Sequence, residues 1–285
     1  MPWWLKIAAK IALSRLPVPY RVWRRLGVFR HGDMACPEHA IETFRRYLDI
    51  GRRHAEIEEG FVSLELGPGD SLLGGVAALA AGASRAWLVD AGKYAEWDME
   101  AAARVVELAR ERFGWKASKY LPEGRSALEE RVRARLGYLT DGVASMRKIP
   151  TGSVDFFWSN VVLEHVPLRD LNALFAELRR VAKDDAVGVH GVDFRDHLGG
   201  GLNNLRFSER VWEGRLMSGS GFYTNRVRMG EMQERMEKAG FSVTVHSQER
   251  WEALPLPQEA MAEPYRSMSE EDLRVAEAVF VLRPC

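Results

Sequence analysis

The stretch Leu64–Asp70, which has the sequence Leu-Glu-Leu-Gly-Pro-Gly-Asp, decides the fold. It joins the apolar run of residues 61–66 to a segment rich in Leu, Val and Ala that extends to Ala81. The first run has the length and composition of a buried strand, and the second those of a buried helix. A glycine-rich turn between a strand and a helix presents backbone N–H groups and the positive end of the helix to a ligand. This turn is therefore the first candidate binding site.

Strand and helix patterns alternate along the rest of the chain. Seven segments have strand composition: residues 61–66, 86–89, 138–140, 154–159, 186–192, 241–246 and 278–282. Helical patterns occur from Pro37 and after the glycine-rich turn, and over residues 97–112, 168–182 and 229–239. Alternation of strands and helices with short connections predicts a parallel sheet that is covered on both faces.

Acidic residues end the second and third strands. Asp90 lies 21 residues after Gly69, where a carboxylate can accept hydrogen bonds from ribose hydroxyls, and Asp141 is placed to bind an exocyclic amine. Ligands of open α/β sheets bind at these strand ends. A dinucleotide fingerprint would need a third glycine where the chain has Leu72, and Asp70 disfavours a pyrophosphate. No Gly-Lys-Ser/Thr follows the turn, so the sequence also excludes a P-loop.

The same residues carry a family resemblance. Leu64–Asp70 resembles motif I of the class I S-adenosylmethionine-dependent methyltransferases, and Val89-Asp90 resembles the acidic end of their second strand. Ser153–Val166 closely resembles their fourth-strand segment, S-x-D-hydrophobic-x-x-S-x-x-V-L-E-H-V. The match spans roughly residues 60–195. It departs from the family at Asp70, where a third glycine is usual, and at residues 140–142, which read Thr-Asp-Gly in place of Gly-Asp-Ala.

The resemblance implies S-adenosylmethionine as the cofactor. Glu65 would orient its amino group, Asp90 would hold the ribose and Asp141 the adenine, while the two glycines of the turn approach the methionine part. The full set of expected cofactor-binding residues is Glu65, Gly67, Gly69, Asp90, Asp141 and Asn160. Because the sulfonium already makes the methyl group electrophilic, the protein mainly supplies alignment and a deprotonated nucleophile.

We therefore expect an α/β protein with a Rossmann-like, mostly parallel seven-stranded sheet and helices on both faces. Residues 1–57 would form an N-terminal helical cap or a membrane-surface segment, and residues 58–198 the cofactor-binding core. Residues 199–228, punctuated by Gly and Asn, would be an insertion after the fifth strand that caps the acceptor. Residues 229–285 would supply the C-terminal helix and the closing strands of the core.

The acceptor should meet the methyl group above the ends of the first, fourth and fifth strands. Histidines follow two of these strands, and a histidine is the natural general base for a hydroxyl acceptor. The catalytic candidates are His165, His197 and Asp193. The substrate-binding candidates are Asp196, Tyr223 and Arg226. Alternatively, His165 could hydrogen-bond to the backbone at a helix start, and Asp193 and Asp196 could cap helices or form turns. No metal is expected, since residues 190–197 have no further ligand cluster nearby.

The overall composition gives no indication of nucleic-acid binding, because 40 basic residues balance 40 acidic ones. Two cysteines, Cys36 and Cys285, make neither a disulfide framework nor a metal quartet, which favours a cytoplasmic protein. Seven of the basic residues precede Asp33 with no acidic residue among them, so 33 basic and 40 acidic residues remain in the rest of the chain. The amino-terminal segment is therefore distinctly basic.

Residues 3–16 predict an amphipathic helix that ends at Pro17. Two interpretations of residues 1–30 remain open: a lid over the cofactor pocket, or an interfacial helix that contacts an anionic membrane. The second would place a cytoplasmic protein peripherally at the inner face of the membrane. No stretch is long and apolar enough to span a bilayer.

Residues 26–32 and 222–226 loosely resemble bacterial methyltransferases of cell-surface polysaccharide synthesis. The first hypothesis is therefore O-methylation of a sugar, a glycan or glycolipid, or another membrane-linked precursor. A second is methylation of a small soluble metabolite or a peptide, and a third is a non-catalytic S-adenosylmethionine-binding partner subunit. The oligomeric state and the methylated atom stay open.

Overall fold

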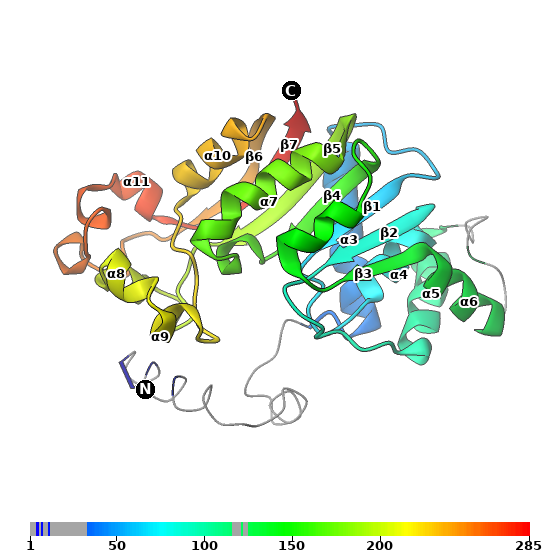
Figure 1. Ribbon diagram of the computed structural model, residues 1–285, viewed down its shortest axis with the longest axis horizontal. Coiled ribbons are helices and arrows are strands. Elements are labelled where there is room, and N and C mark those ends of the chain that lie inside the picture. The colour runs from blue at the N-terminus through cyan, green and yellow to red at the C-terminus, as the bar shows by residue number, and fades with distance from the viewer. Residues whose placement is uncertain (1–3, 6, 8–10, 12–32, 116–120, 122–124) are drawn as a thin grey trace.

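A computed structural model of the chain describes residues 4, 5, 7, 11, 33–115, 121 and 125–285 (Figure 1). These residues form one seven-stranded sheet in the order β3-β2-β1-β4-β5-β7-β6. The strands are β1 (Val62–Leu66), β2 (Arg85–Val89), β3 (Leu136–Leu139), β4 (Val154–Asn160), β5 (Ala182–Asp193), β6 (Phe241–Arg250) and β7 (Val275–Pro284). The first five are parallel, and β7 is antiparallel to both β5 and β6. The predicted α/β class and all seven strands are confirmed, although β5, β6 and β7 are longer than expected.

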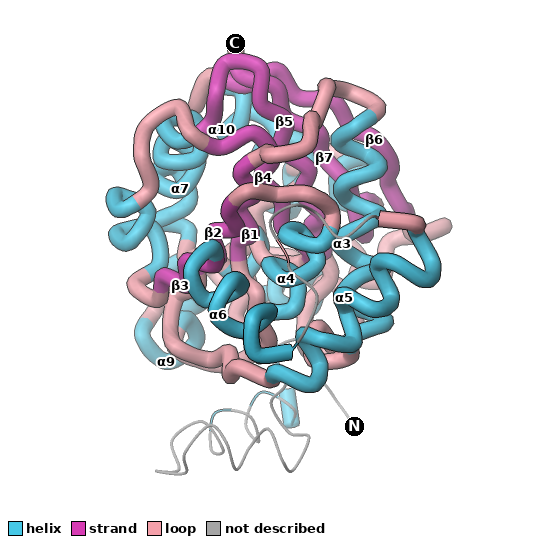
Figure 2. Tube along the Cα trace, turned by 90° about the vertical axis from the view of Figure 1, so that its right-hand side faces the viewer, coloured by secondary structure: helices cyan, strands magenta, loops and turns pink. Residues whose placement is uncertain are grey.

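Helices cover both faces of the sheet (Figure 2). One face packs against α3 (Pro37–Arg52), α4 (Leu73–Ala80) and α5 (Met99–Phe113), and the other against α7 (Leu168–Val181) and α10 (Met229–Lys238). Alternate residues of β4 serve the two layers, since Phe156 and Trp158 join the first core and Phe157 the second. A helix that the sequence did not predict, α6 (Arg125–Arg135), packs beside α5 and β3.

Helix α3 belongs to the core of the domain. A proline stands at its start, and Ile41, Phe44 and Leu48 are fully buried along one side, which matches the predicted spacing. The Phe44 ring meets Trp158 of β4 edge-on at 5.6 Å between centroids. The sequence grouped this helix with the N-terminal cap of residues 1–57, whereas it packs on the sheet. Of the segment before it, only Trp4, Leu5, Ile7 and Ile11 lie within the described residues.

The insertion of residues 199–228 has its own small core. Its helices are η3 (Asn203–Arg206), α8 (Glu209–Trp212) and α9 (Arg215–Ser218), which follow β5 directly. The residues buried together there are Leu198, Trp212, Met217, Phe222 and Tyr223, and Ile7 and Ile11 pack against them. The amino-terminal segment therefore contacts the insertion.

A second excursion, between β6 and β7, was not anticipated from the sequence. It contains η4 (Gln258–Ala260), η5 (Tyr265–Ser267) and α11 (Glu270–Leu273), and it lies beside the insertion (Figure 1). A shared cluster joins the two segments: Leu202, Leu205, Leu256, Met261, Tyr265 and Leu273. The insertion and the residues between β6 and β7 together form a lobe. Residues 229–285 thus include part of this lobe as well as the closing strands.

Candidate active site

The glycine-rich turn after β1 has the backbone shape that only glycine adopts easily. Gly67 and Gly69 have positive φ angles of 62° and 66°. A Cβ atom on Gly67 would lie 2.6 Å from Cγ2 of Val162, so the backbone approaches the segment after β4 closely. The end of β2 holds the turn through two hydrogen bonds. Gly67 N–H donates to the Val89 carbonyl at 2.8 Å, and Gly69 N–H donates to Asp90 Oδ2 at 3.2 Å.

Asp90 and Asp141 lie together at the neighbouring strand ends. The second carboxylate oxygen of Asp90 accepts from Ala91 N–H at 2.7 Å. The Asp90 backbone donates to the Leu139 carbonyl and accepts from Gly142 N–H, each at 2.8 Å, so the ends of β2 and β3 are tied together. Asp141 is exposed at the start of η1 (Gly142–Lys148). A cavity of about 990 Å³ opens beside the turn, lined by Asp70, residues 96–101 and the start of α3.

Glu65 has a buried carboxyl group that is only partly satisfied. Its exposed fraction is 3%, and Oε2 has no hydrogen-bond partner among the described residues. Burial, with a smaller contribution from Asp90, raises the pKa of Glu65 well above its usual range. A cationic group above the turn would supply the missing partner. The residues present therefore fit a ligand with an ammonium group and a ribose, which S-adenosylmethionine has.

Asn160, the last residue of β4, is oriented by α3. Its Oδ1 accepts hydrogen bonds from the Tyr47 hydroxyl at 2.9 Å and from Arg46 Nη2 at 3.2 Å. Burial raises the pKa of Tyr47 to about 12, so its hydroxyl stays protonated and donates. Sequence reasoning missed both α3 residues, because nothing in the helix pattern shows which strand end they reach.

Two histidines and a buried glutamate gather at the ends of β4 and β5. The 3₁₀ turn η2 (Leu163–His165) follows β4, and the His165 and His197 rings meet edge-on with centroids 4.7 Å apart. His165 Nε2 lies 4.0 Å from Glu164 Oε1. The Glu164 carboxyl group is 3% exposed and neither oxygen has a hydrogen-bond partner among the described residues. Burial raises the pKa of Glu164 well above its usual range.

The tautomer of neutral His165 follows from its hydrogen bond to the insertion. Its Nδ1 lies 3.1 Å from the Tyr223 carbonyl oxygen, which can only accept. The proton therefore sits on Nδ1, and the lone pair that can take a further proton is on Nε2. The insertion also fixes the η2 backbone, because Asn225 Nδ2 donates to the Leu163 carbonyl at 2.7 Å. His165 is the candidate of this cluster that is both positioned and accessible, with 39% of its side chain exposed.

The aspartates after β5 have other partners than those expected. Asp193 pairs with Arg195, whose Nε lies 2.9 Å from Asp193 Oδ1 and which also contacts the Glu277 carboxylate. Asp196 is buried and accepts from the backbone N–H groups of Leu198, Gly201 and Asn203. It closes the turn that enters the insertion, which is the turn-forming alternative and not an acceptor contact.

Arg226 and Tyr223 are core residues of the insertion, contrary to the expected acceptor contacts. Arg226 is 5% exposed, donates to the Phe207 carbonyl at 2.6 Å, and lies over the Trp212 and Tyr265 rings. Tyr223 stacks on Trp212, and its hydroxyl donates to Glu213 Oε2 at 2.8 Å. Both side chains are packing residues of the lobe, and the lobe contacts His165 through the Tyr223 carbonyl.

His190 is likewise a core residue. It is fully buried, its Nδ1 lies 2.7 Å from Ser159 Oγ, and burial lowers its pKa to about 3, so the ring is neutral. Across the described residues, no group of three or more His, Cys, Asp or Glu side chains is arranged to hold a metal ion.

Residues 77–189 match the family model of a methyltransferase domain. No curated protein is significantly similar to the chain in sequence. Among solved structures, the chain is similar to phosphoethanolamine N-methyltransferase 2 of Haemonchus contortus (16% identity, TM-score 0.45), covering 85% of this chain and 53% of that one, so it spans about half of that enzyme.

Two further similar structures are bacterial. One is an S-adenosylmethionine-dependent methyltransferase from Mesorhizobium loti, with 15% identity, a TM-score of 0.44, and coverage of 82% of this chain and 96% of that one. The other is geranyl diphosphate C-methyltransferase from Streptomyces coelicolor, with 15% identity, a TM-score of 0.47, and coverage of 86% and 80%. The chain therefore has the class I S-adenosylmethionine-dependent methyltransferase fold, with a match to a methyltransferase domain over residues 77–189.

Proposed function

We propose that the protein transfers a methyl group from S-adenosylmethionine to a hydroxyl group, and that His165 removes the hydroxyl proton. The observation that carries this proposal is the position of His165: its Nδ1 is held by the Tyr223 carbonyl, and its Nε2 lies 4.0 Å from a buried carboxyl oxygen of Glu164. Glu65, Asp90 and the turn glycines would hold the cofactor, which supplies an electrophilic methyl group.

The Glu164 carboxyl group supports His165 electrostatically. A protonated imidazole beside an ionised Glu164 would form an ion pair in a buried setting, where such an interaction is stronger than in water. With Glu164 ionised, its carboxylate stabilises the imidazolium that forms when Nε2 takes the proton of the acceptor hydroxyl, and this lowers the cost of the transfer. His197 packs against the same ring and limits its rotation, so we assign it a positioning role and keep it as the second candidate base.

The acceptor class that we propose is a glycan, a glycolipid or another membrane-linked precursor. Five large hydrophobic side chains are exposed in the described part of the chain, and four of them belong to the amino-terminal segment and the insertion: Trp4, Leu5, Val211 and Leu216. Exposed Arg210 and Arg215 flank the latter two. Apolar side chains beside basic ones suit the surface of an anionic membrane.

This arrangement also favours the membrane interpretation of residues 1–30 over the cofactor lid. Ile7 and Ile11 pack on the insertion, and the basic residues Lys6 and Lys10 stand directly beside them in the sequence. We therefore propose peripheral membrane contact in the cytoplasm. No helix of the described residues has the length and apolar composition needed to cross a bilayer.

A methyl-transfer assay with S-adenosylmethionine and a panel of acceptors tests the proposal. On the acceptor that is turned over, His165→Ala should lower turnover by about 100- to 10,000-fold, the usual contribution of a general base, and should leave S-adenosylhomocysteine affinity unchanged. His197→Ala should have a smaller effect. If both variants keep wild-type turnover from pH 6 to 9, neither histidine is the base, and the acceptor is a group such as an amine that needs none. Cofactor binding without turnover of any acceptor would instead favour a partner subunit.

A further inference from the structure

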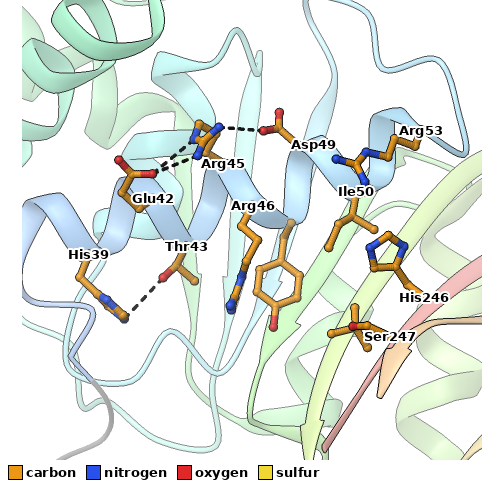
Figure 3. A pocket seen from close by; sticks show the side chains of 12 residues that line it. His39, Glu42, Thr43, Arg45, Arg46, Asp49, Ile50, Arg53, His246 and Ser247 are labelled. Carbon is orange, nitrogen blue, oxygen red and sulfur yellow. Dashed lines mark hydrogen bonds and ion pairs between the residues drawn. The ribbon is translucent and has the colours of Figure 1, made fainter. Parts of the chain in front are cut away.

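A groove lies between α3 and the antiparallel strands β6 and β7, and at the start of α3 His39 lines both this groove and the cavity beside the glycine-rich turn. Its volume is about 660 Å³, and Figure 3 shows Arg46 of α3 and Arg53, which directly follows α3, on the side opposite His246 and Ser247 of β6. None of the residues that line the groove is among the expected cofactor-binding or acceptor-binding residues.

The groove carries a net positive charge once its internal ion pairs are considered. Its two acidic residues, Glu42 and Asp49, both pair with Arg45, at 3.3 Å and 3.1 Å. Within the described chain, neither Arg46 nor Arg53 has a carboxylate at ion-pair distance. The three arginines of the groove therefore exceed its two carboxylates by one positive charge, and both carboxylates lie on Arg45.

The opposite wall carries an imidazole. The His246 ring lies 6.2 Å from that of His54, and burial, Arg53 and His54 lower the pKa of His246 in that order. The positive surroundings therefore disfavour a further cation here. An anion would have the reverse effect, because it would favour the protonated ring.

One end of the groove, at Arg46 and Ser247, lies in the same row of the sheet as the end of β4. Register across the strands pairs Asn160 with Gly191, Gly191 with Val279, and Val279 with Ser247, so these residues form one row from β4 to β6. Arg46 belongs to the groove wall and also donates to Asn160 Oδ1 at 3.2 Å. A molecule lying in the groove would therefore point one end at the end of β4.

We propose that this groove binds a phosphate or diphosphate group carried by the methyl acceptor, with Arg46 and Arg53 as its main ligands and His246 as a further donor. The inference rests on the proposed function, since it makes the groove the anchor that directs a hydroxyl toward His165. Guanidinium groups bind phosphate oxygens through paired hydrogen bonds. The volume exceeds that of a diphosphate and leaves room for the part of the acceptor attached to it.

Calorimetric titration of the full chain with inorganic pyrophosphate, at constant ionic strength and saturating S-adenosylhomocysteine, tests the groove directly. We expect Arg53→Gln to weaken pyrophosphate binding by about tenfold or more, the usual size of a lost charged hydrogen bond. Arg52→Gln, the same change one residue earlier and outside the groove, should bind as wild type. Equal pyrophosphate affinity of the two variants, or no binding by the wild type, would overturn the proposal.

Two further measurements distinguish a soluble from a lipid-linked phosphate, and a failure of the groove proposal from a failure of the proposed function. Displacement of pyrophosphate by a nucleoside diphosphate sugar would indicate a soluble acceptor, and displacement only by phosphatidylglycerol vesicles a lipid-linked one. Folding is checked by S-adenosylhomocysteine affinity, which should be equal in all variants. Since pyrophosphate binding needs no turnover, its measurement tests the groove proposal whether or not His165→Ala lowers turnover.

Discussion

Replacing Glu65 by glutamine should change cofactor affinity and apoprotein stability in opposite directions. The carboxyl group is buried, and Oε2 has no partner among the described residues. Burial raises its pKa above the unfolded value, which is about 4.3. A raised folded pKa means that the folded state binds the proton more tightly than the unfolded chain. Stability from this group is therefore full at pH values below about 4 and is lost as the pH rises through the folded pKa.

Glutamine has nearly the same shape and no charge to bury. We expect Glu65→Gln to raise the free energy of unfolding of the cofactor-free protein at pH 7.5 by about 1–3 kcal/mol, because the wild-type carboxyl must take up a proton on folding at this pH and the amide need not. The gain should shrink as the pH falls toward about 4, where the wild-type carboxyl is protonated in both states. Thermal denaturation between pH 5 and 8.5 measures it.

Cofactor affinity should fall at the same time. If the carboxylate binds the ammonium group of the cofactor, its loss removes a charged hydrogen bond worth about 1.5–3 kcal/mol, which corresponds to roughly 10- to 100-fold weaker binding of S-adenosylhomocysteine. Wild-type affinity should also decrease as the pH drops through the folded pKa of Glu65, and the Gln variant should lose this dependence. Isothermal titration calorimetry measures both.

Glu164→Gln is the matched control. Glu164 is equally buried and also has a raised pKa, but it lies beside His165 on the acceptor side. It should gain apoprotein stability at pH 7.5 and keep S-adenosylhomocysteine affinity. The reasoning is refuted if Glu65→Gln binds S-adenosylhomocysteine as tightly as wild type, or if both variants lose affinity equally.

Two other predictions concern the lobe and the amino-terminal segment. The double substitution Val211→Glu and Leu216→Glu should reduce sedimentation with phosphatidylglycerol vesicles at low salt, and high salt should release the wild type; unchanged sedimentation would argue against membrane contact by the insertion. Arg228→Met should lower the free energy of unfolding by about 3 kcal/mol or more, because the buried guanidinium donates to the carbonyls of Phe194, Leu273 and Val275, which would be left unsatisfied. A denaturant titration with less than about 1 kcal/mol of change would contradict this.

The strand segments and the strand-end residues expected to hold the cofactor could be predicted because their signals are local. The turn of Leu64–Asp70 needs glycine where φ is positive, and the acidic strand ends at Asp90 and Asp141 lie a few residues from their strands. Parallel strands bring their carboxyl ends to one edge, so spacing along the chain is enough to gather these residues. The sequence alone therefore determined the fold class and the expected cofactor.

The acceptor side was decided only by the tertiary structure. Arg226 and Tyr223 were expected to bind the acceptor, but the fold buries Arg226 against Tyr265, from a segment between β6 and β7 that gave no motif, and stacks Tyr223 on Trp212 of the insertion. The same packing sets the Tyr223 carbonyl against His165, and helix α3 brings Arg46 to Asn160 from 114 residues away. Such contacts depend on how apolar faces meet across long sequence separations, and hydrophobic burial is non-directional, so spacing along the chain carries no record of them.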